Sequence, residues 1–276
     1  MVKDEELSSI FENDFHVHTS YSPCAKVKAE STPLQMIRQS ENLGIKTLGF
    51  TDHFAQFPPY PTLKWIGCDV KMIESLRNDI AKINTPVQIL IGVEADVIDK
   101  DKLSIEKKFA KELDYVVISA SHFHLPGIKK PKSKTANEVA QHYVNMLKFA
   151  LSFDFVSIIA HPFKTPNNAL GSPMEYIKNI PMHEFYEIAT MAKQQKIAME
   201  INAHLGVDQE YLEAIKEFIA VCKEVGVKFT YGSDAHNKKG LIPTKGILNA
   251  LNKLNLTPTD FLKTDELIQN HKSAFV

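Results

Sequence analysis

The chain has 276 residues, of which 44% are hydrophobic and 24% charged, which fits one large domain that buries its own core. Its formal net charge of −1 provides no bulk attraction to an anionic membrane and weighs against a long nucleic acid as partner. No apolar run approaches the ~20 residues that cross a bilayer, and the charged segment Met1–Glu6 lacks the apolar stretch of a signal peptide. Three cysteines, Cys24, Cys68 and Cys222, do not form a disulfide framework. The sequence therefore predicts a cytoplasmic protein.

The first predicted strand carries two histidines on one face. In Asp14-Phe15-His16-Val17-His18, polar and apolar residues alternate, so Asp14, His16 and His18 share a face of the strand. Two imidazoles placed in this way can bind a metal ion together. We expect Asp14 to lie behind them and to hold a ring nitrogen.

The rest of the chain alternates helices and strands. Thr32-Pro33 predicts a helix start, with threonine as N-cap and proline at the first helical position, and Gly44 predicts its end. The patterns that follow predict strands over about 46–53, 87–97, 113–121, 155–160, 197–201 and 227–232, and helices over about 69–83, 104–112, 137–151, 182–195, 208–224 and 259–269.

This alternation is typical of an α/β fold with a parallel sheet and crossover helices. The nearly continuous apolar runs at 87–93 and 115–118 suit strands that are buried on both faces. We predict a single domain over residues 1–276, folded as a (β/α) barrel that ends in a helical tail at about 257–276. A barrel would bring the C-terminal ends of all its strands to one mouth.

Metal-binding residue types gather at those strand ends. Any one of them alone could be a polar residue that is satisfied by backbone or water, but together they favour a metal centre of zinc, iron or manganese. Eight ligands exceed the needs of one ion and suggest about two or three, an arrangement that can clamp a phosphoryl group. The residues are His16, His18, His53, Glu94, His122, His161, Asp234 and His236, which include six of the eleven histidines.

The same positions resemble the successive motifs of the polymerase and histidinol phosphatase (PHP) superfamily. The matching segments lie in order between about residues 14 and 240: Asp14-x-His16-x-His18, Thr51-Asp52-His53, Gly92-Val93-Glu94, Ser121-His122, Ala160-His161-Pro162 and Ser233-Asp234-Ala235-His236. The resemblance implies a distorted seven-stranded barrel with a trinuclear site. It assigns His16, His18, Glu94 and Asp234 to a first metal, Glu94, His122 and His161 to a second, and His53 and His236 to a third.

One position departs from that pattern. Many members of the superfamily have another histidine six residues beyond the second one, and this chain has Cys24 there. A thiolate at Cys24 could be a ligand of the third metal, and its softness would favour zinc. The alternative is that Cys24 is a bystander and the third site is weak or empty.

The resemblance implies a metal-dependent phosphoesterase, most often a phosphomonoesterase similar to histidinol phosphatases, in which a hydroxide that bridges the metals attacks phosphorus. Glu94 and Asp234 would act in the centre. Asp14 and Asp52 are candidates to support it from behind, and capping or buried hydrogen bonding is the alternative for both. Candidates for binding a small phosphorylated substrate are Lys164, Lys130 and its neighbours Lys129 and Lys132, and His204 and His124. Lysines in surface loops are usually only solvated, and packing is the alternative for the two histidines.

Other functions stay open at this stage. One is a nuclease or nucleotide phosphatase of the same superfamily, and another is a non-catalytic scaffold that binds metal. A third is hydrolysis of an amide or a lactone, which the ligands alone do not distinguish. Both arginines, Arg38 and Arg77, fall in predicted helices, and the lack of a loop arginine weakens the case for histidinol phosphate in particular.

Overall fold

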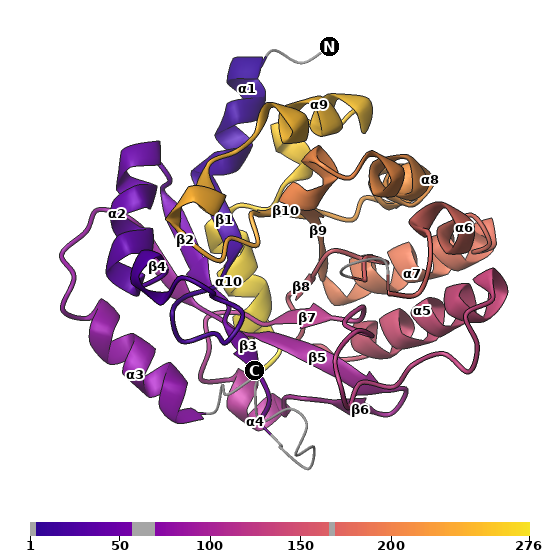
Figure 1. Ribbon diagram of the computed structural model, residues 1–276, viewed down its shortest axis with the longest axis horizontal. Coiled ribbons are helices and arrows are strands. Elements are labelled where there is room, and N and C mark those ends of the chain that lie inside the picture. The colour runs from indigo at the N-terminus through magenta and orange to yellow at the C-terminus, as the bar shows by residue number, and fades with distance from the viewer. Residues whose placement is uncertain (1–3, 57–69, 166–168) are drawn as a thin grey trace.

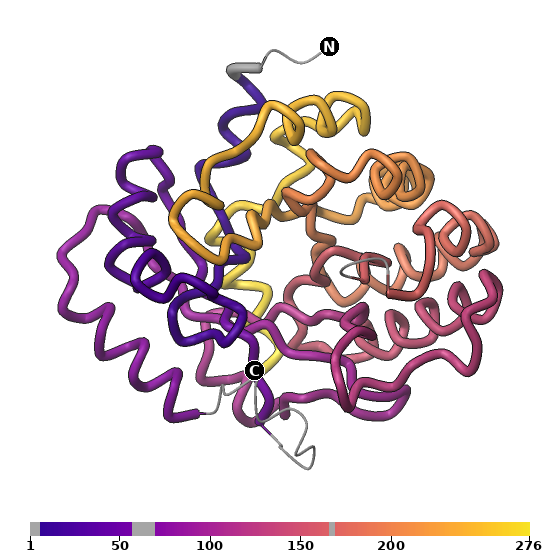
Figure 2. The backbone as a smooth tube through the Cα atoms, viewed as in Figure 1, coloured from indigo at the N-terminus to yellow at the C-terminus, as the bar shows by residue number. Residues whose placement is uncertain are grey.

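The computed structural model describes residues 4–56, 70–165 and 169–276 (Figures 1 and 2). Its strands are β1 Asn13–Val17, β2 Thr47–Phe50, β3 His53–Phe54, β4 Gln88–Ile91, β5 Glu94–Asp99, β6 Lys102–Leu103, β7 Val117–Ser119, β8 Ile158–Ile159, β9 Ala198–Asn202 and β10 Phe229–Gly232. Its α-helices are α1 Asp4–Ser8, α2 Pro33–Leu43, α3 Val70–Ile80, α4 Lys107–Ala110, α5 Ala136–Leu151, α6 Pro173–Ile177, α7 Met182–Gln195, α8 Gln209–Val225, α9 Lys245–Lys253 and α10 Thr264–Ser273. None of these helices is long and apolar enough to cross a membrane.

Local sequence signals set the ends of α2, as expected. The Thr32 side chain accepts a hydrogen bond from the Gln35 backbone N–H, and Pro33 occupies the first position of the helix. Gly44 ends the helix at φ 70°, in the left-handed region that favours glycine.

The strands form a parallel α/β structure, which confirms the predicted fold class. One sheet has the order β1-β2-β4 and the other β10-β9-β8-β7-β5-β3, and every described pair is parallel except β5 with β6. Helices surround the strands (Figure 1). Residues next to the outermost strands also meet: the His18 N–H donates to the Ala235 carbonyl at 2.9 Å, and the Asp234 N–H donates to the His16 carbonyl at 2.8 Å. Closure of the sheet into a barrel stays a prediction.

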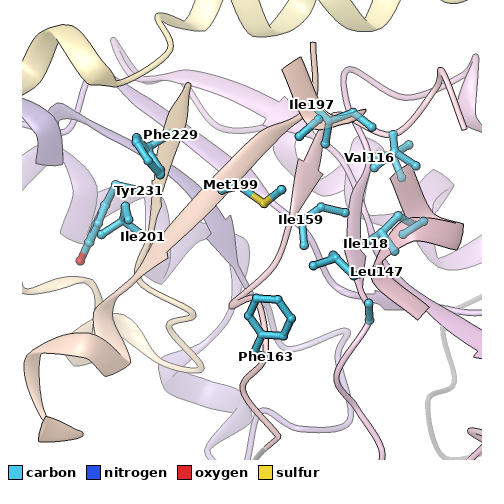
Figure 3. Packing of buried hydrophobic residues seen from close by; sticks show 14 of the residues in the cluster. Val116, Ile118, Leu147, Ile159, Phe163, Ile197, Met199, Ile201, Phe229 and Tyr231 are labelled. Atoms are coloured by element: carbon cyan, nitrogen blue, oxygen red, sulfur yellow. The ribbon is translucent and has the colours of Figure 1, made fainter. Parts of the chain in front are cut away.

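Two groups of buried apolar side chains hold the layers together. The larger one packs the strands against the helices, and Figure 3 shows part of it around Phe163 and Met199. The smaller one lies around Phe15 and Tyr115 and includes Leu262 and Leu267 from the C-terminal segment. The segment that contains Leu262 and Leu267 is therefore part of the core.

Several predicted boundaries were wrong. The strand expected over 87–97 is divided into β4 and β5, and the helix expected over 104–112 is shortened to the single turn of α4, Lys107–Ala110. The helix expected over 259–269 is a 3₁₀ turn, Pro258–Asp260, followed by α10. Helices α1, α6 and α9 were not predicted. The expected helix start at residue 69, and Cys68, lie outside the described residues.

Candidate metal centre

Glu94, the first residue of β5, lies at the centre of the site and is 1% exposed. One of its oxygens, Oε2, is 2.9 Å from Nδ1 of His53, 3.5 Å from Nε2 of His16 and 3.6 Å from Nε2 of His18. The other, Oε1, is 3.2 Å from Nε2 of His161 and 3.5 Å from Nε2 of His122. One buried carboxylate thus faces five imidazoles.

Asp234 supplies a second carboxylate from the segment after β10. Its Oδ1 lies 3.1 Å from Nε2 of His18, and 3.8 Å from both Nε2 of His16 and Nδ1 of His236. Its Oδ2 lies 3.4 Å from Nε2 of His204. The structure therefore brings together all eight side chains that the strand ends predicted, and it adds His204 at their edge.

The donor atoms fit divalent metal ions. Nε2 of His16 and Nε2 of His18 face each other at 3.2 Å, and Nδ1 of His18 is buried with no hydrogen-bond partner in the described part of the chain. Three sets of side chains have ligand atoms within 4.8 Å of one another: His18, Cys24, His53 and His236; His16, His18 and Glu94; His53, Glu94 and His122. Imidazoles with carboxylates suit zinc, iron or manganese.

Charge pairing shifts the pKa values of these groups. Burial acts to raise the pKa of Glu94, but the neighbouring charges of His122, His16 and His53 hold it well below its usual value. Burial acts to lower the pKa of His16, but the carboxylates of Glu200 and Glu94 raise it well above 6.5. Without a metal, these groups are therefore an ion-paired cluster, so that metal binding must displace protons from the imidazoles.

Cys24 belongs to this cluster. Burial acts to raise the pKa of its thiol, but the charge of His18 and the nearby imidazoles of His236 and His53 lower that pKa to about 2. A lowered pKa favours the thiolate, which is the form of cysteine that binds metal ions.

A second layer of carboxylates holds the candidate ligands, and the sequence analysis did not find it. Oε1 of Glu200, on β9, is 2.6 Å from Nδ1 of His16, and Oε2 accepts the His161 backbone N–H at 2.6 Å. Oδ1 of Asp96, on β5, is 2.7 Å from Nδ1 of His122. A usable signal existed for Asp96, because Glu94-x-Asp96 repeats the alternation of His16-x-His18.

The expected contact of Asp14 with a histidine ring was wrong. Asp14 instead accepts the backbone N–H groups of Ser233 at 3.0 Å and His16 at 3.2 Å, and it joins β1 to the end of β10. Burial raises its pKa to about 6. Asp52 accepts the backbone N–H and the hydroxyl of Thr19, each at 2.6 Å, and so fixes the start of the loop after β1.

Glycine and left-handed backbone allow this packing. A Cβ at Gly232 would overlap Oε1 of Glu200 and lie 2.7 Å from Cβ of His16, so only glycine lets Glu200 approach His16. His161 at φ 24°, Phe163 at φ 63° and Asp234 at φ 55° adopt a conformation that L residues rarely take. Two of the candidate ligands thus lie on strained backbone.

A cavity of about 1150 Å³ opens onto most of the candidate ligands. Its lining includes Lys164, whose Nζ forms an ion pair with Asp208 and lies 5.4 Å from the centre of the Tyr211 ring. His204 and His124 also line it, as does Lys26, which was not predicted. The described lining does not include the loop lysines Lys129, Lys130 and Lys132, which are exposed.

Comparison with known proteins identifies the family. A family model of the PHP domain matches residues 14–213. The chain belongs to the PHP domain family. A probable phosphatase of Acetivibrio thermocellus is 31% identical over 225 residues, which cover 81% of this chain and 78% of that protein. A probable phosphatase of Clostridium acetobutylicum is 24% identical over 257 residues, which cover 92% and 90% of the two chains.

A solved structure shares the fold of this PHP domain. It is the histidinol phosphate phosphatase of Lactococcus lactis, complexed with zinc, L-histidinol and phosphate. The two structures superpose with a TM-score of 0.59 at 18% identity, and the match covers 88% of this chain and 91% of the other.

Proposed function

We propose that this protein is a metal-dependent phosphomonoesterase that acts on a small phosphorylated substrate. The observation that carries the proposal is the convergence of six imidazoles and two carboxylates in one cluster, of which four imidazoles and both carboxylates line a cavity of about 1150 Å³. The probable phosphatases among its relatives support it. The chemistry of the zinc complex of the Lactococcus lactis protein supports a phosphate monoester as the substrate class.

We infer that two to three divalent ions bind here. One would be held by His16, His18, Glu94 and Asp234, a second by Glu94, His122 and His161, and a third by the group around His53 and His236. When bound, such ions neutralise phosphate oxygens and lower the pKa of water, so that a nucleophile is available near neutral pH.

The chain's own residues orient the ligands and the substrate. Glu200 and Asp96 accept the Nδ1 protons of His16 and His122, which leaves Nε2 of each ring facing the centre. Lys164 and His204 lie on the cavity wall, where a phosphate can accept their hydrogen bonds. The ion pair with Asp208 holds the Lys164 ammonium at that wall.

We also infer that the strands close into a distorted barrel and that the chain forms one domain. The backbone hydrogen bonds between the segments of β1 and β10 support closure. The packing of Leu267 among side chains of β1, β4, β7, β8 and β9 supports a single domain.

Release of inorganic phosphate tests the proposed function. The purified protein would be assayed on L-histidinol phosphate, an aryl phosphate, nucleotides and short oligonucleotides, each with and without a chelator. We expect release from monoesters that the chelator abolishes, and loss of turnover in His16→Ala and Glu94→Ala with an unchanged circular dichroism spectrum. Activity that persists in both variants would refute the site. Activity on oligonucleotides alone would indicate a nuclease, and no release from metal-loaded protein would indicate a scaffold or another hydrolase.

A further inference from the structure

The loop after β1 presents Cys24 to three histidines. Its Sγ and one ring nitrogen from each of His18, His53 and His236 lie within 4.8 Å of one another. The rings of His53 and His236 flank that of His18, with centres 4.7 Å and 4.6 Å away. His18 and His236 follow β1 and β10, and His53 begins β3, so the thiol completes a group that three strands assemble.

His18 contributes to this group a ring nitrogen that could bind a metal ion. Its Nε2 lies close to Asp234 and His16, whereas Nδ1 is buried and has no hydrogen-bond partner among the described residues. The side chain is 0% exposed. A buried nitrogen without a partner is costly and is satisfied when a cation binds there.

The loop is built to hold the thiol in place. Oγ of the buried Ser22 lies 3.0 Å from Sγ of Cys24. The Ala25 N–H donates to the Ser22 carbonyl at 3.2 Å, and Lys28 donates to the carbonyls of Ser20 and Ser22. These hydrogen bonds fix the loop, so the Cys24 thiol is held close to the histidines.

We propose that Cys24, His53 and His236, with His18 beside them, form a thiolate-containing site that selects zinc over manganese and magnesium. The selectivity follows from ligand softness, because thiolate and imidazole suit zinc, while the harder ions prefer oxygen ligands. The two neighbouring sets that share Glu94 have only nitrogen and oxygen donors and discriminate less. This inference specifies one part of the proposed metal centre. It rests on the proposed function only for the identity of the ligands that the two share.

Metal content and cobalt spectra test the proposal. Wild type, Cys24→Ser and Cys24→His would be stripped of metal, reloaded with zinc or manganese under a reductant that is not a thiol, and analysed by mass spectrometry. We expect Cys24→Ser to retain one zinc ion fewer than wild type, and Cys24→His to recover that ion but to take manganese more readily. Cobalt-loaded wild type should show thiolate-to-cobalt charge-transfer absorption that both variants lack. Cys222→Ala, which removes the buried core thiol, should leave the metal content unchanged.

Equal zinc content in wild type and Cys24→Ser, or no charge-transfer absorption in wild type, would overturn the proposal. If the variants do not fold, the reaction of wild-type Cys24 with a thiol reagent decides: zinc should block it and manganese should not. A charge-transfer band in a protein without phosphatase activity would refute only the proposed function. Phosphatase activity in a protein without the band would refute only the thiolate site.

Discussion

Glu200 holds His16 from behind, with its Oε1 2.6 Å from His16 Nδ1. Both residues are at most 2% exposed. Because the other oxygen of Glu200 accepts the backbone N–H of His161, one carboxylate on β9 orients a ring on β1 and the chain after β8. The hydrogen bond also fixes which ring nitrogen of His16 faces the centre.

Glu200→Gln should therefore weaken metal binding. The amide keeps the size of the side chain but removes the charge that favours a proton on Nδ1, and loss of such a supporting partner costs about 10- to 100-fold in metal affinity or activity. Competition with a chromophoric chelator measures the affinity. The exposed Glu217→Gln serves as the control. Unchanged affinity in Glu200→Gln would show that His16 is oriented without this carboxylate.

Gly232→Ala should disrupt the contact between Glu200 and His16. The new methyl group would overlap Oε1 of Glu200, and overpacking of this kind typically costs about 1–3 kcal/mol. Because the clash is with the Glu200 side chain, the double variant with Glu200→Ala should lose less stability than the sum of the single changes. Urea unfolding of all four proteins gives the coupling energy. Strict additivity would mean that the methyl group is accommodated elsewhere.

Lys164→Met should impair substrate binding. The change keeps an unbranched, mostly apolar side chain but removes the charge that we place beside the phosphate. Loss of a charged hydrogen bond of about 1.5–3 kcal/mol lowers kcat/KM by about 10- to 100-fold. Lys130→Met is the matched control, because Lys130 is exposed and outside the described cavity lining. Steady-state kinetics on the best monoester decide. Equal effects of the two changes would remove Lys164 from the substrate site.

Leu267→Ala should destabilise the whole domain. Leu267 is 1% exposed in the apolar group around Phe15 and Tyr115, and removal of a buried leucine side chain costs about 2–5 kcal/mol. Leu34→Ala, at a position that is 45% exposed, should change the free energy of unfolding by no more than about 0.5 kcal/mol. A single urea transition that shifts as a unit is expected. A separate early transition would show that α10 folds independently.

The docking of α10 should weaken in acid. His271 is buried, with Nδ1 3.1 Å from the Ser157 hydroxyl and Nε2 3.0 Å from the Ala110 carbonyl. Burial lowers its pKa below 6.5. The unfolded chain therefore binds the proton more readily, so the free energy of unfolding falls as the pH drops below 6.5.

His271→Gln should reduce the pH dependence of the free energy of unfolding in this range. Urea unfolding of wild type and variant at pH about 8 and about 5.5, both without metal, isolates His271 because the other histidines are common to both proteins. Identical slopes would show that His271 does not contribute.

The ligands could be predicted because they follow a rule of the fold. Parallel strands end at one edge, and His18, His122 and His161 follow β1, β7 and β8, so their position alone indicated the site. Glu200 could not be found in this way. It lies within the apolar strand Ala198–Asn202, and its partner is 184 residues away, so the pairing depends on which strands are neighbours.

The missed elements have physical reasons too. Helix α9 begins with Lys245-Gly246, and glycine is a poor helix former, but Gly246 is required there because a Cβ would overlap the carbonyl of Gly206. The strand expected over 87–97 divides because its first part pairs with β2 and its second with β3 and β7. Both features depend on tertiary contacts, which the local sequence does not reveal.

The left-handed backbone at His161 and Asp234 places stability and function in conflict. At φ 24° and 55°, glycine or asparagine would relieve strain of about 1–3 kcal/mol per residue, yet neither would supply the imidazole or the carboxylate that faces the centre. Selection for thermal tolerance alone would therefore replace these two residues early. A laboratory lineage evolved only to survive heating should lose its metal-binding capacity through these positions first, while its fold persists.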